Sequence, residues 1–166
     1  MVRTMRAPVP MPGPPLPPQV RSCIVVVVGL PGSGKTTYLE QHCLPSLSSD
    51  AIRKLLADDE TDQTIHARVF PTLRYLLYHR IAIGRPVTYM DATHLTPQER
   101  RPYILMARLF DCRVEALFFD VPVEICKERN RRRRRVVPEE ALERMAARLV
   151  PPTLEEGFHA VRVVRP

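Results

Sequence analysis

The stretch Cys23-Ile-Val-Val-Val-Val28, followed directly by Gly29-Leu-Pro-Gly-Ser-Gly34-Lys35-Thr36, decides the fold of this chain. A continuous β-branched run predicts a strand buried on both faces, as in a parallel sheet. The next eight residues match the phosphate-binding pattern G-x-x-x-x-G-K-[ST] at every fixed position, and residues 35–42 resemble a helix. Because strand, loop and helix follow in the order that this loop requires, the alternative of a chance glycine-rich turn is disfavoured.

The loop predicts a site for a nucleoside triphosphate. Its glycines let successive backbone N–H groups converge on phosphate oxygens, and the helix N-terminus adds partial positive charge. Lys35 is expected to reach the β- and γ-phosphates, and the Thr36 hydroxyl to ligate Mg²⁺ directly. The loop residues predicted to bind ATP are Gly29, Pro31, Gly32, Ser33, Gly34, Lys35, Thr36 and Thr37.

Beyond the loop, strand-like and helix-like segments alternate, which implies βαβ units and a mainly parallel sheet in an α/β domain. Thr96 is a predicted N-cap, with Pro97 at the first helical position. Further strands are expected at 44–47, 86–90, 114–119 and 158–164, and helices at 50–57, 61–83, 97–110, 122–132 and 138–149.

The composition is that of a single globular domain. The chain has 166 residues, 45% of them hydrophobic, and no apolar run approaches the roughly 20 residues of a membrane span. Its four cysteines are scattered without metal-ligand spacing, as expected for buried thiols in a reducing cytoplasm. Seven prolines in residues 1–20 predict an extended tail, so we expect a disordered tail at 1–21 and one folded domain at 22–166.

The net charge of +7 has a local origin, because much of the excess lies in the run Arg129-Asn-Arg-Arg-Arg-Arg-Arg135. One interpretation is a solvated helix end. The other is a mobile lid whose arginines neutralise charge on a transferring phosphoryl group. One or two arginines suffice for that task, so the surplus would bind a nucleic-acid backbone or serve no function.

Three further residues are candidates for chemistry. Asp91 ends a predicted strand, where a carboxylate assists the metal, directly or through water; Ala92 follows it instead of the second acid that hydrolytic motors use. Asp50 could accept the proton of an attacking hydroxyl, and Arg53 could hold a substrate phosphate. The alternative is an N-cap aspartate beside a solvated arginine.

Four histidines lack the spacing of metal ligands and are interpreted as surface or interface residues: His66, His79, His94 and His159.

Taken together, these residues resemble the 5′-hydroxyl polynucleotide kinase domain found in phage polynucleotide kinase and in bacterial RNA-repair enzymes. The resemblance extends over about residues 22–164. It rests on an ordered set of motifs: G-L-P-G-S-G-K-T-T at 29–37, D-x-x-R at 50–53, D-A-T-H-L-T-P-Q-E-R-R at 91–101, F-F-D-V-P at 118–122, E-R-N-R-R-R at 128–133 and V-V-P-E-E at 136–140.

The resemblance implies a P-loop NTPase fold with a five-stranded sheet in the order 2-3-1-4-5 and an arginine-rich lid between strands 4 and 5. Asp50 would be the general base on the 5′-hydroxyl, and Arg53 would bind the acceptor's 3′-phosphate. Arg133 would be the lid arginine on the donor phosphate. The remaining residues implied are Arg129 for ATP, Asp91 and Thr93 in the acceptor pocket, and Val137 against the acceptor base.

The sequence therefore predicts a Mg²⁺-dependent, cytoplasmic phosphotransferase that moves the ATP γ-phosphate to a hydroxyl, namely the 5′-OH of RNA or DNA. It points to no membrane and to no particular protein partner. Two alternatives stay open. One is a kinase of a sugar, nucleoside or antibiotic, and the other is a module that binds ATP or nucleic acid without turnover. The predicted catalytic residues are Lys35, Asp50, Arg53 and Arg133.

Overall fold

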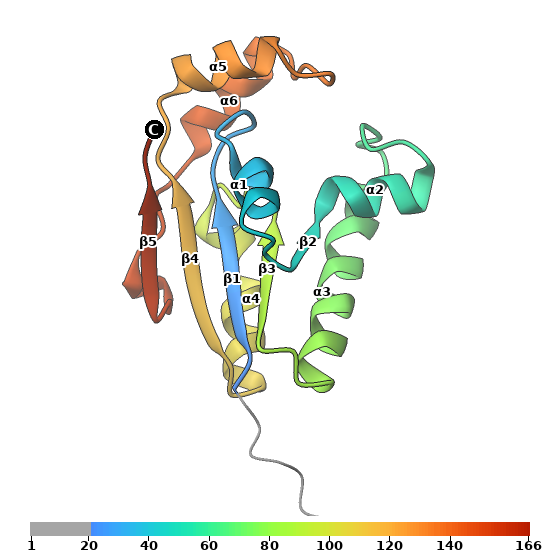
Figure 1. Ribbon diagram of the computed structural model, residues 1–166, viewed down its shortest axis with the longest axis vertical. Helices are drawn as coiled ribbons and strands as arrows, with labels where there is room; N and C mark the ends of the chain where they lie inside the picture. The colour runs from blue at the N-terminus through green and yellow to red at the C-terminus, as the bar shows by residue number, and fades with distance from the viewer. Residues whose placement is uncertain (1–20) are drawn as a thin grey trace, which may run out of the picture.

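A computed structural model describes residues 21–166 (Figure 1), so the tail predicted at 1–21 lies outside the described residues except for Arg21. Five strands form one parallel sheet in the order β2-β3-β1-β4-β5, which confirms the predicted fold and strand order. The strands are β1 (Cys23–Val28), β2 (Ser46–Ser48), β3 (Val87–Asp91), β4 (Arg113–Phe119) and β5 (Ala160–Val164).

Helices cover both faces of the sheet, and the central strand explains why. Ile24, Val26 and Val28 of β1 pack into one core cluster, and Val25 and Val27 pack into the other. The first cluster lies under α3 (His66–Ala82) and α4 (Pro97–Leu109), and the second lies under α1 (Lys35–Gln41), α5 (Val123–Arg131) and α6 (Glu139–Arg148). Because neither face of this strand contacts solvent, its residues do not alternate between apolar and polar, and its sequence is continuously apolar.

Among the element boundaries that differ from the prediction, two do so for clear local reasons. The helix expected from residue 61 begins at His66, because Asp59 and Asp62 each accept hydrogen bonds from the backbone N–H and hydroxyl of the residue two positions later. Such side-chain turns compete with helix formation. Strand β2 begins at Ser46 instead of 44, just after Pro45, which has no N–H to donate to a ladder.

The carboxyl ends of the parallel strands meet at one edge of the sheet, where α/β proteins bind ligands. In Figure 1 this is the upper edge. The β1–α1 loop lies there at the end of β1, with α5 and α6 above it and α2 (Ser49–Ala57) to one side. The segment after α5 extends toward α2 across this edge. None of the helices within residues 21–166 is both long and apolar enough to cross a membrane.

Candidate active site

A cavity of about 1480 Å³ opens at this edge and gathers the predicted site residues. It is lined by the β1–α1 loop, the first turn of α2, the N-terminal half of α3, the end of β3, and the segment that follows α5. Apart from Gly29, all the residues predicted for the site line this cavity: Pro31, Gly32, Ser33, Gly34, Lys35, Thr36, Thr37, Asp50, Arg53, Asp91, Thr93, Arg129, Arg133 and Val137.

The β1–α1 loop has the backbone that its sequence requires. Gly32 and Gly34 have φ values of 81° and 94°, in the left-handed region that favours glycine. A Cβ on Gly32 would lie 2.6 Å from the Cys126 carbonyl oxygen, so α5 packs directly on the loop. The Ser33 Oγ is buried and has no hydrogen-bond partner within residues 21–166. A buried hydroxyl without a partner inside a loop of this kind fits a ligand that supplies oxygen atoms.

Lys35 is buried beneath the loop. Its Nζ donates to the carbonyl oxygens of Gly29, at 2.9 Å, and Leu30, at 2.8 Å. Burial lowers the pKa of Lys35 to about 8; Asp91 opposes this shift and Arg133 adds to it. The Lys35 ammonium therefore stabilises the loop through these two hydrogen bonds. A phosphate that entered the loop would compete with the two carbonyl oxygens for the ammonium.

Thr36 and Asp91 are the residues whose oxygen atoms could hold a cation. The Thr36 hydroxyl donates to Asp91 Oδ2 at 2.8 Å, and burial raises the pKa of Asp91 although Thr36 and Lys35 oppose the shift. No group of three or more His, Cys, Asp or Glu side chains with metal-binding geometry occurs in residues 21–166. One hydroxyl and one carboxylate nevertheless fit Mg²⁺, which prefers oxygen and takes its other ligands from water and substrate phosphates.

The part of the cavity beside α2 is built around Asp50 and Arg53. Ser48, not Asp50, caps α2, because its side chain accepts from the Ala51 N–H. Arg53 is buried, and its Nη1 donates to Asp50 Oδ1 at 3.3 Å. The alternative of an N-cap aspartate beside a solvated arginine is therefore wrong. His66 Nδ1 lies 3.3 Å from Arg53 Nη2, so this histidine belongs to the cavity.

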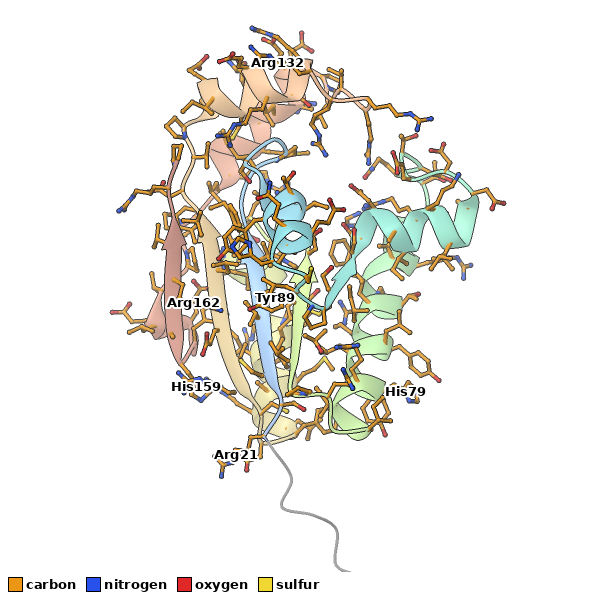
Figure 2. The ribbon with its side chains drawn as sticks, in the orientation of Figure 1. Arg21, His79, Tyr89, Arg132, His159 and Arg162 are labelled. Carbon is orange, nitrogen blue, oxygen red and sulfur yellow. The ribbon has the colours of Figure 1, made fainter. Side chains whose placement is uncertain are left out.

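The arginine run divides into two groups. Arg129 Nη1 donates to the Ser33 carbonyl at 3.4 Å and Arg133 lines the cavity, while their roles on the donor phosphates stay predictions. Arg131 and Arg132 instead form exposed ion pairs with Glu139 and Glu128. Figure 2 shows Arg132 on the outer side of α5, away from the sheet.

One site residue was missed by sequence reasoning, which counted it among the surplus arginines. Arg135 lines the cavity, and its Nη1 donates to Asp50 Oδ1 at 3.2 Å and to the Glu60 carbonyl at 3.1 Å. Asp50 and Arg135 are 85 residues apart, and nothing in a run of identical side chains distinguishes the one that turns inward.

The prediction of a surface or interface position is wrong for His94. This residue is 2% exposed, with Nδ1 2.7 Å from the Val27 carbonyl oxygen and Nε2 3.2 Å from the Tyr103 hydroxyl. Burial lowers its pKa to about 4. The neutral ring thus donates from Nδ1 to the Val27 carbonyl and accepts at Nε2 from the Tyr103 hydroxyl.

The other two histidines predicted at the surface, His79 and His159, are exposed, and Figure 2 shows them at the edge of the molecule.

A comparison with protein families matches residues 24–152 to a family model described as an AAA domain. Among solved structures, a chain of the Pnkp1/Rnl/Hen1 RNA repair complex superposes with a TM-score of 0.66 at 16% identity. That match covers 78% of this chain but 44% of the other, so this chain spans less than half of its relative.

Two more structures are similar over most of both chains. Chaetomium thermophilum Kti12 in complex with ADP-AlF3 matches with a TM-score of 0.62 and 20% identity, covering 86% of this chain and 88% of that one. Mycobacterium tuberculosis APS kinase CysC in complex with AMPPNP and APS matches with a TM-score of 0.55 and 16% identity, covering 88% and 89%. At such identities the likeness establishes the P-loop kinase fold, as predicted.

Proposed function

The chain belongs to the family described as an AAA domain, and from this and its P-loop kinase fold we propose that it transfers the γ-phosphate of ATP to the 5′-hydroxyl end of RNA or DNA. One observation carries the proposal. Asp50, the candidate base, lies beside the buried Arg53 in the same cavity as the phosphate-binding loop. A donor phosphate on the loop and an acceptor hydroxyl at Asp50 would thus share one cavity.

The residues on the donor side would position and neutralise the triphosphate. Backbone N–H groups of the loop, the Lys35 ammonium and the guanidinium groups of Arg129 and Arg133 all border this part of the cavity. Thr36 and Asp91 would hold Mg²⁺, which when bound offsets the charge of the donor phosphates. Positioning and charge neutralisation provide most of the acceleration in phosphoryl transfer.

On the acceptor side, Asp50 would accept the hydroxyl proton as the oxygen attacks phosphorus. A new oxygen–phosphorus bond forms, the bond between the γ-phosphorus and the ADP oxygen breaks, and the proton moves to the carboxylate. Arg53 would hold a phosphate on the acceptor by charge-assisted hydrogen bonds. Ala92 follows Asp91 where a hydrolytic motor has a second acid, which supports transfer to an acceptor over transfer to water.

The test is transfer of labelled γ-phosphate from ATP to a 5′-OH oligonucleotide, with and without Mg²⁺. Asp50→Asn should reduce transfer by at least about a hundredfold, the order expected of a general base, while ATP binding stays near the parental level. Glu155→Gln, which alters an exposed carboxylate outside the cavity, is the matched control and should transfer normally. Transfer by Asp50→Asn at the parental rate would refute the base assignment.

A small-molecule acceptor is the second outcome of the same experiment. If ATP binds but no oligonucleotide is labelled, sugars, nucleosides and other small alcohols become the acceptors to screen, and the loop assignments are unaffected. If ATP binds and no acceptor of either kind is labelled, the chain is a binding module without turnover.

A further inference from the structure

Helix α3 begins at the cavity and leads away from it. In Figure 1 it runs from beside α2, near the upper edge of the sheet, toward the opposite edge. Its first half lines the cavity through Phe70, Pro71 and Arg74. Two tyrosines follow directly, Tyr75 and Tyr78, and both lie beyond the cavity lining. The surface that continues the cavity along α3 is therefore aromatic.

Helical spacing places these residues on one side of α3. Pro71 and Tyr75 are four positions apart, as are Arg74 and Tyr78, and side chains at this spacing lie one above the other on a helix. The side of α3 that packs into the core holds a different set: Val69, Leu73 and Leu77. We call Pro71, Arg74, Tyr75 and Tyr78 the α3 stripe. It begins at the cavity wall and ends on the open surface.

Both tyrosines of the α3 stripe present their rings to solvent. Tyr75 is 62% exposed and Tyr78 is 42% exposed. The His79 ring lies edge-on to both, with centroid distances of 4.5 Å and 5.1 Å, and Figure 2 shows His79 at the outer edge of the molecule. The Tyr78 ring also lies 5.5 Å from that of Phe110, just after α4. Exposed rings supported by their neighbours offer faces on which another planar group can stack.

The charge around the α3 stripe has one sign. Helix α3 contains no Asp or Glu, and Asp91 is the single acidic residue between positions 63 and 98. None of the ion pairs within residues 21–166 includes Arg74, or Arg68, which precedes Pro71 by three positions and so lies beside the stripe. Guanidinium groups without carboxylate partners, next to exposed aromatic rings, favour a polyanion.

A single nucleic-acid strand is the polyanion that fits this surface. Its bases have planar faces that stack on tyrosine rings, and its phosphates pair with arginines. A duplex keeps its bases stacked on one another and leaves none for the rings. From His66 to Tyr78 the helix rises about 18 Å. A stacked strand rises about 3.4 Å per nucleotide, so this length accommodates about five nucleotides.

We propose that the α3 stripe is a binding track for the single strand that extends from the acceptor hydroxyl. Bases stack on Tyr75 and Tyr78, and phosphates pair with Arg68 and Arg74. This inference rests on the proposed transfer to a nucleic-acid end and says how the rest of that strand is held. Because the tyrosines lie beyond the cavity, the track makes the chain favour long acceptors over short ones, whether or not the acceptor carries a terminal phosphate.

The test compares equilibrium binding of 5′-OH single strands of two and eight nucleotides, in an RNA and a DNA series. The parental chain should bind the longer strand more tightly, and the series with the larger gain identifies the preferred nucleic acid. Tyr78→Ser should reduce the gain from length about tenfold, the order of one stacked base. Tyr78→Phe keeps the ring and should keep most of the gain.

Two further variants separate stacking from a general loss of structure. Tyr75→Ser removes a ring that is mostly exposed, so the core is left intact, and it should reduce the gain to a similar extent. Leu154→Ser is the matched control, because Leu154 is 60% exposed but lies neither on α3 nor in the cavity lining. It should leave the gain unchanged.

Salt dependence measures the arginines. Arg74→Gln should reduce the slope of log affinity against log salt for the longer strand by about 0.7, the value of one phosphate contact on a single strand. Arg144→Gln removes an exposed arginine of α6 outside the cavity lining and should leave the slope unchanged. A parental slope in Arg74→Gln would overturn the phosphate contact.

The outcomes separate the track from the proposed function. Equal affinity of the parental chain for the two lengths, or an undiminished gain in both serine variants, would overturn the track. Serine variants that change from dimer to monomer in sedimentation, with the gain retained, would assign this face to a second copy of the chain instead. Phosphate transfer without a gain from length would leave the proposed function standing while the track fails. A gain that the serine variants lose, in a chain that transfers no phosphate, would support the track and contradict the transfer.

Discussion

The hydroxyl of Thr36 donates to the carboxylate of Asp91 at 2.8 Å, although the two residues are 55 positions apart. Thr36 is in the first turn of α1 and Asp91 is the last residue of β3, a strand that pairs directly with β1. The hydrogen bond therefore links the phosphate-binding loop to the neighbouring strand at the point where a magnesium ion would be held.

We expect Thr36→Ala to weaken the Mg²⁺ dependence of ATP binding. The change removes one of two protein oxygens and leaves the buried Asp91 carboxylate without its donor, so the apparent Mg²⁺ affinity should fall by about tenfold or more. Thr36→Ser keeps the hydroxyl and should retain the parental value. Titration of Mg²⁺ against ATP binding measures both, and a parental affinity in Thr36→Ala would show that this hydroxyl is not a ligand.

The buried ammonium of Lys35 should make stability depend on alkaline pH. Its pKa is about 8 in the folded chain against an ordinary value of 10.5, so between these values the unfolded chain binds more protons. Stability therefore rises as pH increases through this window, by on the order of 3 kcal/mol in total. Urea unfolding from pH 7.5 to 10.5 should show the rise, and Lys35→Met should lack it. ATP affinity should fall over the same window, as the ammonium loses its proton.

His94 should have a corresponding effect in acid. Its pKa is about 4 when folded and 6.5 otherwise, because the neutral ring is buried between Val27 and Tyr103. Between these values the unfolded chain again binds more protons, so stability is lost as pH falls from about 6.5 toward 4, by on the order of 3 kcal/mol. His94→Gln should flatten the difference in unfolding free energy between pH 7 and pH 4.5. An identical slope in the variant would contradict the burial of a neutral ring.

Two glycines with similar backbone angles allow a controlled test of the contact between the loop and α5. Gly32 and Gly84 have φ values of 81° and 77°. A Cβ added to Gly32 would collide with the Cys126 carbonyl, whereas a Cβ added to Gly84 would have none of the described atoms within 4 Å. Gly84→Ala should cost about 1–2 kcal/mol from backbone strain alone. Gly32→Ala should cost more and should also weaken ATP binding, because α5 must move away from the loop. Equal losses would mean that the contact is not tight.

The donor half of the site was predictable, because its chemistry lies in one contiguous stretch. The loop 29–37 is local in sequence, and its glycines are required wherever the backbone must curl around phosphate. Asp50, Arg53 and Asp91 were predictable for a related reason: each follows a predicted strand, and parallel strands bring their carboxyl ends to a common edge. The strand order itself came from the resemblance to a known kinase domain.

Other features depend on contacts that no local pattern records. The burial of His94 depends on a loop that turns back to the Val27 carbonyl with a φ of 44°. The start of α3 depends on competition between side-chain turns and the helix. In each case the outcome is a balance between alternatives of similar local free energy, which packing against the rest of the molecule decides.

The sequence by itself determined the fold class, the phosphate-binding loop and the residues that follow the strands, since hydrophobic periodicity and backbone freedom are local properties. Only the tertiary structure decided which arginine of the run faces Asp50. Arg131, Arg132 and Arg135 have the same side chain, and what separates them is the turn closed by Asn130 on Val137 together with the positions of Glu139, Glu128 and Asp50. A guanidinium group pairs with the carboxylate that the folded chain brings within reach, and that distance is set by the whole fold.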